Sequence, residues 1–415
     1  MGMTIGEKIL ARACNKEEVK PGEIITAKVD LCMTNDATTH ISIDIFQNKL
    51  KHKKIFDPNK IIFIVDHNIP SESVKTAEVQ LKMRNFAEEQ GVHFYEGDGV
   101  CHQIMLEDFV VPGQLIVAAD SHTCSYGSIG AFGTGVGSTD FTSAMNTGEM
   151  WMMVPETIKF VLEGEFKPNV YARDLILKII GDIGTNGANY KIMEFSGPAV
   201  EKLTIDDRIV LCNMAVEAGA KTALFEADEK AIQFVKGRGR EEMYLFESDE
   251  DAHYEKVYHY NLADIEPMVA KPHFVDNWDL AANLGEVKID QCFIGSCNNG
   301  RIEELRVAAD ILKGKKVSSS VKLLISPASK EIYLQAINEG LIDIFVECGA
   351  LVMNPNCSVC WGGCQGVIGE GEVLLSTGTR NFKGRAGHAD SFVYLASAAT
   401  VAASAITGRI TDPRR

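Results

Sequence analysis

Short apolar runs, each followed by a helix-forming segment, alternate along most of the chain. Ile61–Asp66 (IIFIVD) predicts a buried strand, and Val74–Gln90, closed by Gly91, predicts the helix after it. Gln114–Asp120 (QLIVAAD) predicts a second strand, which leads through a glycine-rich loop to a Ser138–Asp140 cluster typical of a helix cap. Strand-then-helix repetition of this kind favours an α/β fold built on mostly parallel sheets.

The second half of the chain repeats this pattern. Gln291–Gly295 and Val321–Ser326 predict strands, and Ile302–Leu312 and Ser329–Glu339 predict the helices that follow them. The apolar stretch Phe392–Ile406 is too short to span a bilayer, so we expect a buried helix of small residues there and no membrane contact.

The chain of 415 residues has room for two or three domains of ordinary size. The alternation of predicted strands and helices is interrupted near Pro155 and again within Pro267–Pro272. We therefore expect three α/β domains, over residues 1–155, 156–275 and 276–415, with a cysteine-rich segment in the last.

The net charge of −16 argues against a nucleic-acid-binding surface, and an anionic ligand would need arginines to create a local positive site. The eleven cysteines are odd in number, and the N-terminal residues lack the apolar core of a signal peptide. We therefore expect a cytoplasmic protein whose cysteines are thiols or metal ligands.

One cysteine-rich segment, Asn354–Gly366 (NPNCSVCWGGCQG), is the most informative part of the sequence. Cys357 and Cys360 form a Cys-x-x-Cys pair in a loop of Gly, Pro and Asn, which can direct two thiolates at one metal. This spacing alone fits zinc, a redox pair or an iron–sulfur cluster. Cys364 could complete a four-cysteine site, although we favour its packing among the neighbouring glycines.

Cys297, in Phe293–Arg301 (FIGSCNNGR), lies between a predicted strand end and a helix start, where main-chain amides favour a thiolate. We therefore predict Cys297, Cys357 and Cys360 as metal ligands. A structural zinc site would use four ligands, whereas three ligands on a four-iron cluster leave one iron open to a substrate.

Acidic, imidazole and guanidinium side chains mark a second set of candidates. Asp66–His67 and Asp120–His122 fall at the carboxyl ends of predicted strands, where ligands of open α/β sheets gather. Arg380 and Arg385 flank a short loop, and two guanidinium groups suit the two carboxylates of a dicarboxylate.

Together these motifs resemble those of the aconitase superfamily. FIGSCNNGR and CSVC resemble its cluster-binding motifs, and further motifs occur in the family's order: DH at 66–67, GVCHQ at 99–103, ADSHT at 119–123, CNMAVEAGAK at 212–221 and NFKGR at 381–385. The likeness runs along essentially the whole chain and is closest to the compact large subunits of 3-isopropylmalate dehydratase and homoaconitase.

The resemblance implies a three-domain aconitase-like α/β/α fold that holds a [4Fe-4S] cluster. Its implied activity is that of a hydro-lyase, which dehydrates and rehydrates a branched 2-hydroxy-dicarboxylate. The implied acid–base residues are Asp66, His67, His102, Asp120 and His122. The implied substrate-binding residues are Arg380, Arg385 and Glu194, the last in YKIMEFSG.

Full-length aconitases carry a catalytic serine, in a Gly-Ser-Ser-Arg context, on a swivelling fourth domain, and this sequence contains no such segment. The resemblance therefore implies a separate small subunit that supplies the serine. His40 and Thr379 depart from the aconitase pattern and argue against citrate. We favour 3-isopropylmalate as substrate and keep 2,3-dimethylmalate and homocitrate as alternatives. A metal-stabilised binding protein without catalysis is the alternative of a different class.

Overall fold

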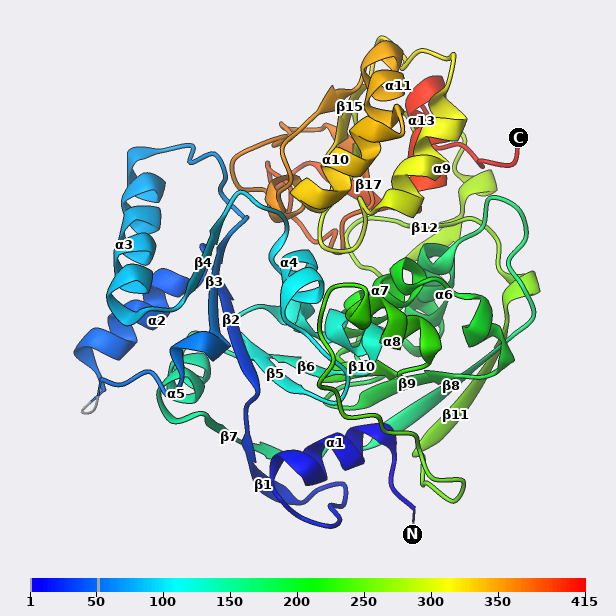
Figure 1. The fold of residues 1–415 in the computed structure, drawn as a ribbon. Coiled ribbons are helices and arrows are strands. Elements are labelled where there is room, and N and C mark those ends of the chain that lie inside the picture. The colour runs from blue at the N-terminus through cyan, green and yellow to red at the C-terminus, as the bar shows by residue number, and fades with distance from the viewer. Residues whose placement is uncertain (1, 51–52) are drawn as a thin grey trace.

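The computed structural model describes residues 2–50 and 53–415, which fold into layers of helices and mostly parallel sheets (Figure 1). None of the helices in these ranges is long and apolar enough to cross a membrane. The first helix, α1 (Ile5–Ala13), precedes a two-stranded antiparallel ribbon of β1 (Ile24–Lys28) and β7 (Glu149–Met153).

The first large sheet is fully parallel, in the order β4-β3-β2-β5-β6. Its strands are β2 (Leu31–Asn35), β3 (Ile61–Val65), β4 (His93–Glu96), β5 (Leu115–Ala118) and β6 (Phe132–Gly135). The helices around it are α2 (Thr39–Asn48), α3 (Val74–Gln90), α4 (Cys101–Asp108) and α5 (Ser138–Thr147). Alternate strand residues are buried on both faces: Phe63 packs with α2, α3 and α5, whereas Ile64 packs with α4.

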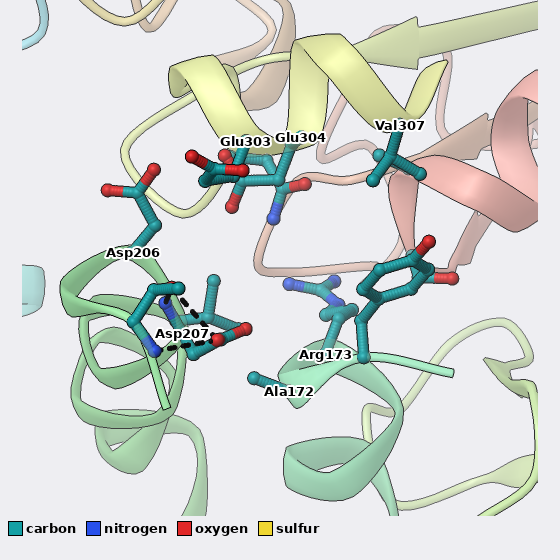
Figure 2. Close-up of a pocket in the computed structure, with 13 residues that line it drawn as sticks. Ala172, Arg173, Asp206, Asp207, Glu303, Glu304 and Val307 are labelled. Carbon is teal, nitrogen blue, oxygen red and sulfur yellow. Dashed lines mark hydrogen bonds between the residues drawn. The ribbon is translucent and has the colours of Figure 1, made fainter. Parts of the chain in front are cut away.

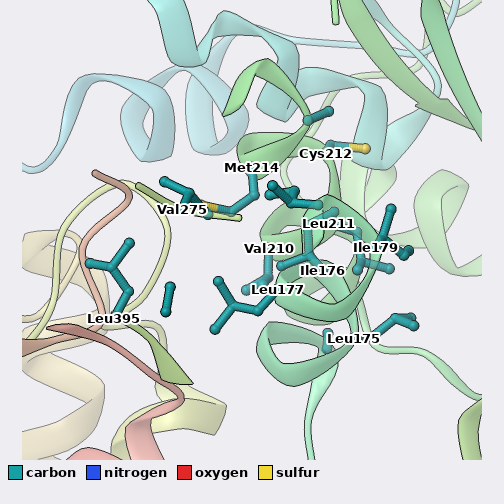
Figure 3. Packing of buried hydrophobic residues seen from close by; sticks show 14 of the residues in the cluster. Leu175, Ile176, Leu177, Ile179, Val210, Leu211, Cys212, Met214, Val275 and Leu395 are labelled. Carbon is teal, nitrogen blue, oxygen red and sulfur yellow. The ribbon is translucent and has the colours of Figure 1, made fainter. Parts of the chain in front are cut away.

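The second sheet is also fully parallel, in the order β10-β9-β8-β11. Its strands are β8 (Thr157–Glu163), β9 (Ile192–Ser196), β10 (Thr222–Phe225) and β11 (Lys256–Asn261). Helices α6 (Ala172–Ile183), α7 (Ile205–Met214) and α8 (Glu229–Lys236) alternate with the strands. Ile176 and Leu177 of α6 belong to the same buried cluster as Val210 and Leu211 of α7 (Figure 3).

The third sheet has seven strands, in the order β13-β12-β18-β17-β14-β15-β16, and is antiparallel only where β12 pairs with its neighbours. Its strands are β12 (Met268–Ala270), β13 (Trp278–Leu280), β14 (Gln291–Ile294), β15 (Lys322–Ile325), β16 (Leu351–Val352), β17 (Val373–Ser376) and β18 (Phe392–Leu395). Its helices are α9 (Ile302–Leu312), α10 (Lys330–Asn338), α11 (Leu341–Cys348), α12 (Ser358–Trp361) and α13 (Ala398–Thr407).

The predicted α/β class with mostly parallel sheets is confirmed, and α3 and α9 have the predicted bounds. The three large sheets occupy residues 31–135, 157–261 and 268–395, while the division of the chain into three domains stays a prediction.

Two local predictions are wrong. Phe392–Ile406 is not one helix, because β18 pairs with β17 before Ser397 caps α13 through a hydrogen bond from the Thr400 main-chain NH. The N-cap of α5 is Gly137, and no side chain of the Ser138–Asp140 cluster caps it.

Candidate active site

Nine of the eleven predicted site residues line one cavity of about 190 Å³. They are His67, His102, Asp120, His122, Cys297, Cys357, Cys360, Arg380 and Arg385. Topology explains this convergence. The carboxyl ends of the parallel strands β3 and β5 present Asp66–His67 and Asp120–His122, while β14 and β17 of the third sheet lead into Cys297 and Arg380.

The three predicted cysteine ligands are buried and their thiols contact one another. Cys357 hydrogen-bonds to both Cys297 and Cys360 through its side chain. The hydrogen bond to Cys357, together with the nearby imidazoles of His122 and His102, lowers the pKa of Cys297 to about 6 against the opposing effect of burial. The pKa of Cys360 lies well below its usual range, because of Cys357 and the guanidinium of Arg385. Cys297 and Cys360 thus share the thiol of Cys357 as a common hydrogen-bond partner, which favours their deprotonated form.

The main chain gives these sulfurs close support. Cys357 donates its NH to the carbonyl of Asp66 at 2.9 Å, which joins the cysteine loop to the acid–base residues. Thr379 Oγ1 lies 3.6 Å from Cys360 Sγ. A Cβ at Gly378 would come within 3.1 Å of the same sulfur, so the main chain of this loop packs closely against Cys360.

Cys364 behaves differently from the three cavity cysteines. Its Sγ donates to the carbonyl of Ile69 at 3.9 Å, and it is absent from the described residues that line the cavity. The structure thus brings together the sulfurs of Cys297, Cys357 and Cys360 without Cys364.

Asp66 and His67 form a buried pair, with Asp66 Oδ1 2.7 Å from His67 Nδ1. Asp66 Oδ2 accepts the NH of Cys101, and Asp36 accepts the NH groups of both members of the pair. Burial lowers the pKa of His67, but Asp66, Asp36 and Asp120 outweigh it and raise that pKa to about 10. His67 is therefore an imidazolium at neutral pH, and its Nε2 lies 3.8 Å from Asp120 Oδ2 in the cavity lining.

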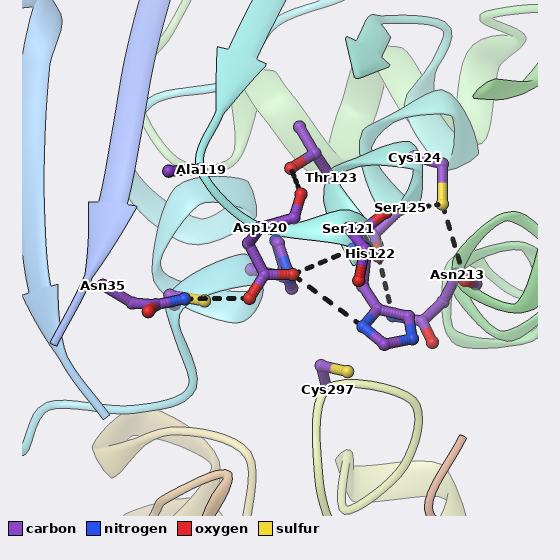
Figure 4. A network of polar contacts seen from close by, with 12 residues as sticks. Asn35, Ala119, Asp120, Ser121, His122, Thr123, Cys124, Ser125, Asn213 and Cys297 are labelled. Atoms are coloured by element: carbon purple, nitrogen blue, oxygen red, sulfur yellow. Dashed lines mark hydrogen bonds and ion pairs between the residues drawn. The ribbon is translucent and has the colours of Figure 1, made fainter. Parts of the chain in front are cut away.

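Asp120 is the centre of the polar network in Figure 4. Its Oδ1 lies 2.8 Å from His102 Nε2 and accepts the NH of His122 at 2.8 Å, while its Oδ2 accepts from Asn35 Nδ2 at 2.8 Å. Burial alone would raise the pKa of Asp120, but His102, His122 and His67 hold it well below its usual range. Asp120 is therefore a carboxylate that fixes the positions of the surrounding imidazoles.

Glu217 is a site residue that the sequence reasoning missed. Its Oε1 lies 3.1 Å from His122 Nε2 and 2.8 Å from Arg380 Nε. Arg380 also donates to Ser121 Oγ at 2.9 Å. Glu217 belongs to CNMAVEAGAK, a motif that carried the family resemblance, so its position in that motif was the available signal.

Glu194, which the resemblance implied as a substrate-binding residue, lies outside the cavity. Its carboxylate accepts from Ser248 Oγ at 3.0 Å and Tyr254 Oη at 2.6 Å, and its residue does not line the cavity within the described chain. On β9 it pairs in register with Leu224, so strand alternation directs its side chain to the segment around Ser248. Burial raises its pKa.

Comparison with known proteins agrees with this geometry. The model of the aconitase family (aconitate hydratase) matches residues 7–280 and 277–408. The "3-isopropylmalate dehydratase large subunit 1" of Pyrococcus furiosus is 53% identical over 99% of this chain and 98% of that protein. The "3-isopropylmalate dehydratase large subunit" of Aquifex aeolicus is 49% identical over 100% of this chain and 97% of that protein.

One solved structure, Thermococcus kodakaraensis aconitase X in its holo-form, superimposes with a TM-score of 0.51 at 12% identity, covering 85% of this chain and 84% of that one. At that identity it supports the aconitase fold alone. The chain belongs to the aconitase family. The predicted family and its hydro-lyase class are confirmed.

Proposed function

We propose that this chain is the large subunit of a 3-isopropylmalate dehydratase that holds a [4Fe-4S] cluster on Cys297, Cys357 and Cys360. Two observations together carry the proposal. The chain is 53% identical along its length to a relative of that name. One cavity is lined by the three predicted cysteine ligands and Cys101, with two arginines and three histidines.

The donor set fits such a cluster. Three buried cysteines line one cavity, and the lowered pKa of Cys297 and Cys360 favours the thiolate, the form that binds iron. Arg385 Nη2 donates to Cys360 Sγ, while the buried Nε of Arg385 has no hydrogen-bond partner in the described part of the chain. A bound group beside Cys360 could supply the missing acceptor. When bound, the cluster would supply a Lewis acid for the substrate hydroxyl and a neighbouring carboxylate.

The surrounding residues have separate tasks in this scheme. Arg380 and Arg385 bind the carboxylates of the substrate, and Glu217 and Ser121 hold the Arg380 fork in place. His67, protonated and held by Asp66, delivers a proton from Nε2 to the departing hydroxyl. His102 and His122 keep their orientation through Asp120.

The base that removes the carbon-bound proton comes, in this proposal, from a separate small subunit. Ser121 lines the cavity, but its Oγ accepts a hydrogen bond from Arg380, so we assign it to positioning that arginine and not to the base. The relatives are named large subunits, which supports a second chain. Branched malates of the same chemical type, 2,3-dimethylmalate and homocitrate, are the alternative substrates.

The test is anaerobic reconstitution of the chain with iron and sulfide, followed by assay with its co-expressed small subunit against the three acids. We expect visible-range cluster absorption in the wild type, none in Cys357→Ser, and the highest kcat/KM with 3-isopropylmalate. The chain alone should turn over slowly. Bound zinc without visible absorption would instead favour a metal-stabilised binding protein.

A further inference from the structure

Three arginines are buried in the described chain, and their surroundings differ. Arg208 forms an ion pair with Asp228, with Nη1 2.8 Å from Oδ1. Arg173 and Arg301 form no ion pair with any described carboxylate. Because a buried charge is costly unless it is compensated, such a guanidinium requires a source of negative charge.

Arg173, at the start of α6, is bonded to two loops of the site. One terminal nitrogen donates to Asn298 Oδ1, next to Cys297, and the other donates to the carbonyl of Gly378. Gly378 lies against Cys360 Sγ and precedes Arg380 by two residues. Arg173 therefore ties the loop of the first cysteine to the loop of the substrate-binding arginines.

Nearby carboxylates do not neutralise this guanidinium by contact. Asp174, the next residue, accepts the main-chain NH groups of Tyr171 and Met268. Asp206 and Glu304 line a cavity of about 170 Å³ on which Arg173 also borders (Figure 2). Burial raises the pKa of Glu304 to about 8, so this acid is largely protonated at neutral pH. Cys360 contributes the largest attraction to Arg173, followed by Asp174, Glu217 and Cys297.

We propose that Arg173 is a positioning residue whose charge is compensated in part by the thiolates of the metal-binding cysteines and the net negative charge of the cluster that they would hold. Three thiolates on a cluster carry net negative charge into a buried region, and a fixed cation that is hydrogen-bonded to Asn298, next to Cys297, offsets it. This inference rests on the proposed iron–sulfur site, and it adds a residue that touches neither substrate nor metal.

The proposal predicts an effect on the cluster itself. Arg173→Met should lower the reduction potential of the reconstituted cluster, because loss of a nearby cation disfavours the more negative, reduced form. The rise in Tm on reconstitution should also be smaller than in the wild type. Arg173→Lys, which keeps the charge, should restore the potential toward the wild-type value. The measurements are an EPR-monitored redox titration and paired melting curves with and without cluster.

Arg208→Met is the matched control, since it removes a buried arginine that is paired with Asp228 away from the cysteines. It should lower both melting curves equally and leave the potential unchanged. The same behaviour in Arg173→Met would overturn the inference. Should Arg173→Met fail to fold, Arg173→Gln, which keeps hydrogen-bond donors without charge, takes its place with the same expected shift. A wild type that incorporates no cluster would defeat the proposed function itself, and is recognised by its absorption before any variant is compared.

Discussion

Asp66 Oδ1 lies 2.7 Å from Nδ1 of the adjacent His67, and both side chains are buried at the end of β3. The contact fixes which nitrogen of the ring faces the cavity and keeps the ring protonated. Since Cys357 donates its NH to the carbonyl of the same aspartate, the acid pair and the cysteine loop share one support. The proposed proton donor and the proposed metal-binding loop therefore both depend on the position of Asp66.

The pair predicts a pH dependence of stability. The pKa of His67 is about 10 in the folded chain, against an ordinary value of 6.5, so the native state binds this proton more tightly than the unfolded state. Its stabilising contribution is complete below pH 6.5 and is lost as pH rises toward 10. The wild type should therefore lose more unfolding free energy than His67→Gln over this range, by at most about 1.4 kcal/mol per pH unit. Urea unfolding of both proteins from pH 6 to 10 measures the difference, and parallel curves would contradict the assignment.

We expect substitution of Glu217 to lower activity and substitution of Glu194 to leave it nearly unchanged. Hydrogen bonds to charged groups are worth about 1.5–3 kcal/mol, so Glu217→Gln should lower kcat/KM by about 10- to 100-fold, because the common partner of Arg380 and His122 loses its negative charge. Glu194→Gln is the matched control, because it neutralises another buried glutamate outside the cavity. Steady-state assay of the complete enzyme should find Glu194→Gln close to wild type. Equal losses in the two variants would remove Glu217 from the site.

Much of the site could be predicted because it depends on strand ends and on short motifs. The runs IIFIVD and QLIVAAD predict where the parallel strands end, and strand ends of one sheet edge must meet, so Asp66 and Asp120 could be placed together from the sequence. Glu217 could not be placed in this way. It lies in a short helical turn after α7, where no period indicates the direction of a side chain.

The position of Glu194 outside the cavity could not be predicted for a different reason. It lies in a regular strand, but the sequence does not reveal which face of β9 turns toward the cysteines. Buried polar contacts such as Arg173 with Asn298 join residues 125 positions apart, and such pairs follow from the tertiary fold alone.

The cysteines allow a test of how many protein sulfurs the metal uses. Cys364→Ser should retain the iron content and the visible spectrum of the reconstituted wild type, because its sulfur is directed to the carbonyl of Ile69. Cys357→Ser should lose both, since its thiol contacts Cys297 and Cys360. Cys292→Ser, which changes a buried cysteine of β14, controls for altered folding. Iron analysis and absorption under anaerobic conditions decide between three sulfurs and four, and loss of the cluster in Cys364→Ser would favour four.

We expect Arg380→Lys to weaken substrate binding although it keeps the positive charge. The planar guanidinium of Arg380 donates to Glu217 and Ser121 and has a further nitrogen for a substrate carboxylate. Lysine keeps the positive charge but cannot make all of these contacts at once. Arg380→Lys should therefore raise KM by about 10-fold or more, since loss of one charge-assisted hydrogen bond costs about 1.5–3 kcal/mol. Arg306→Lys is the control: Arg306 pairs with Glu339 on the exposed side of α9, where surface ion pairs contribute little. Initial rates across a range of 3-isopropylmalate concentrations separate KM from kcat. An unchanged KM in Arg380→Lys would mean that the guanidinium serves Glu217 and not the substrate, and carboxylate binding would then fall to Arg385.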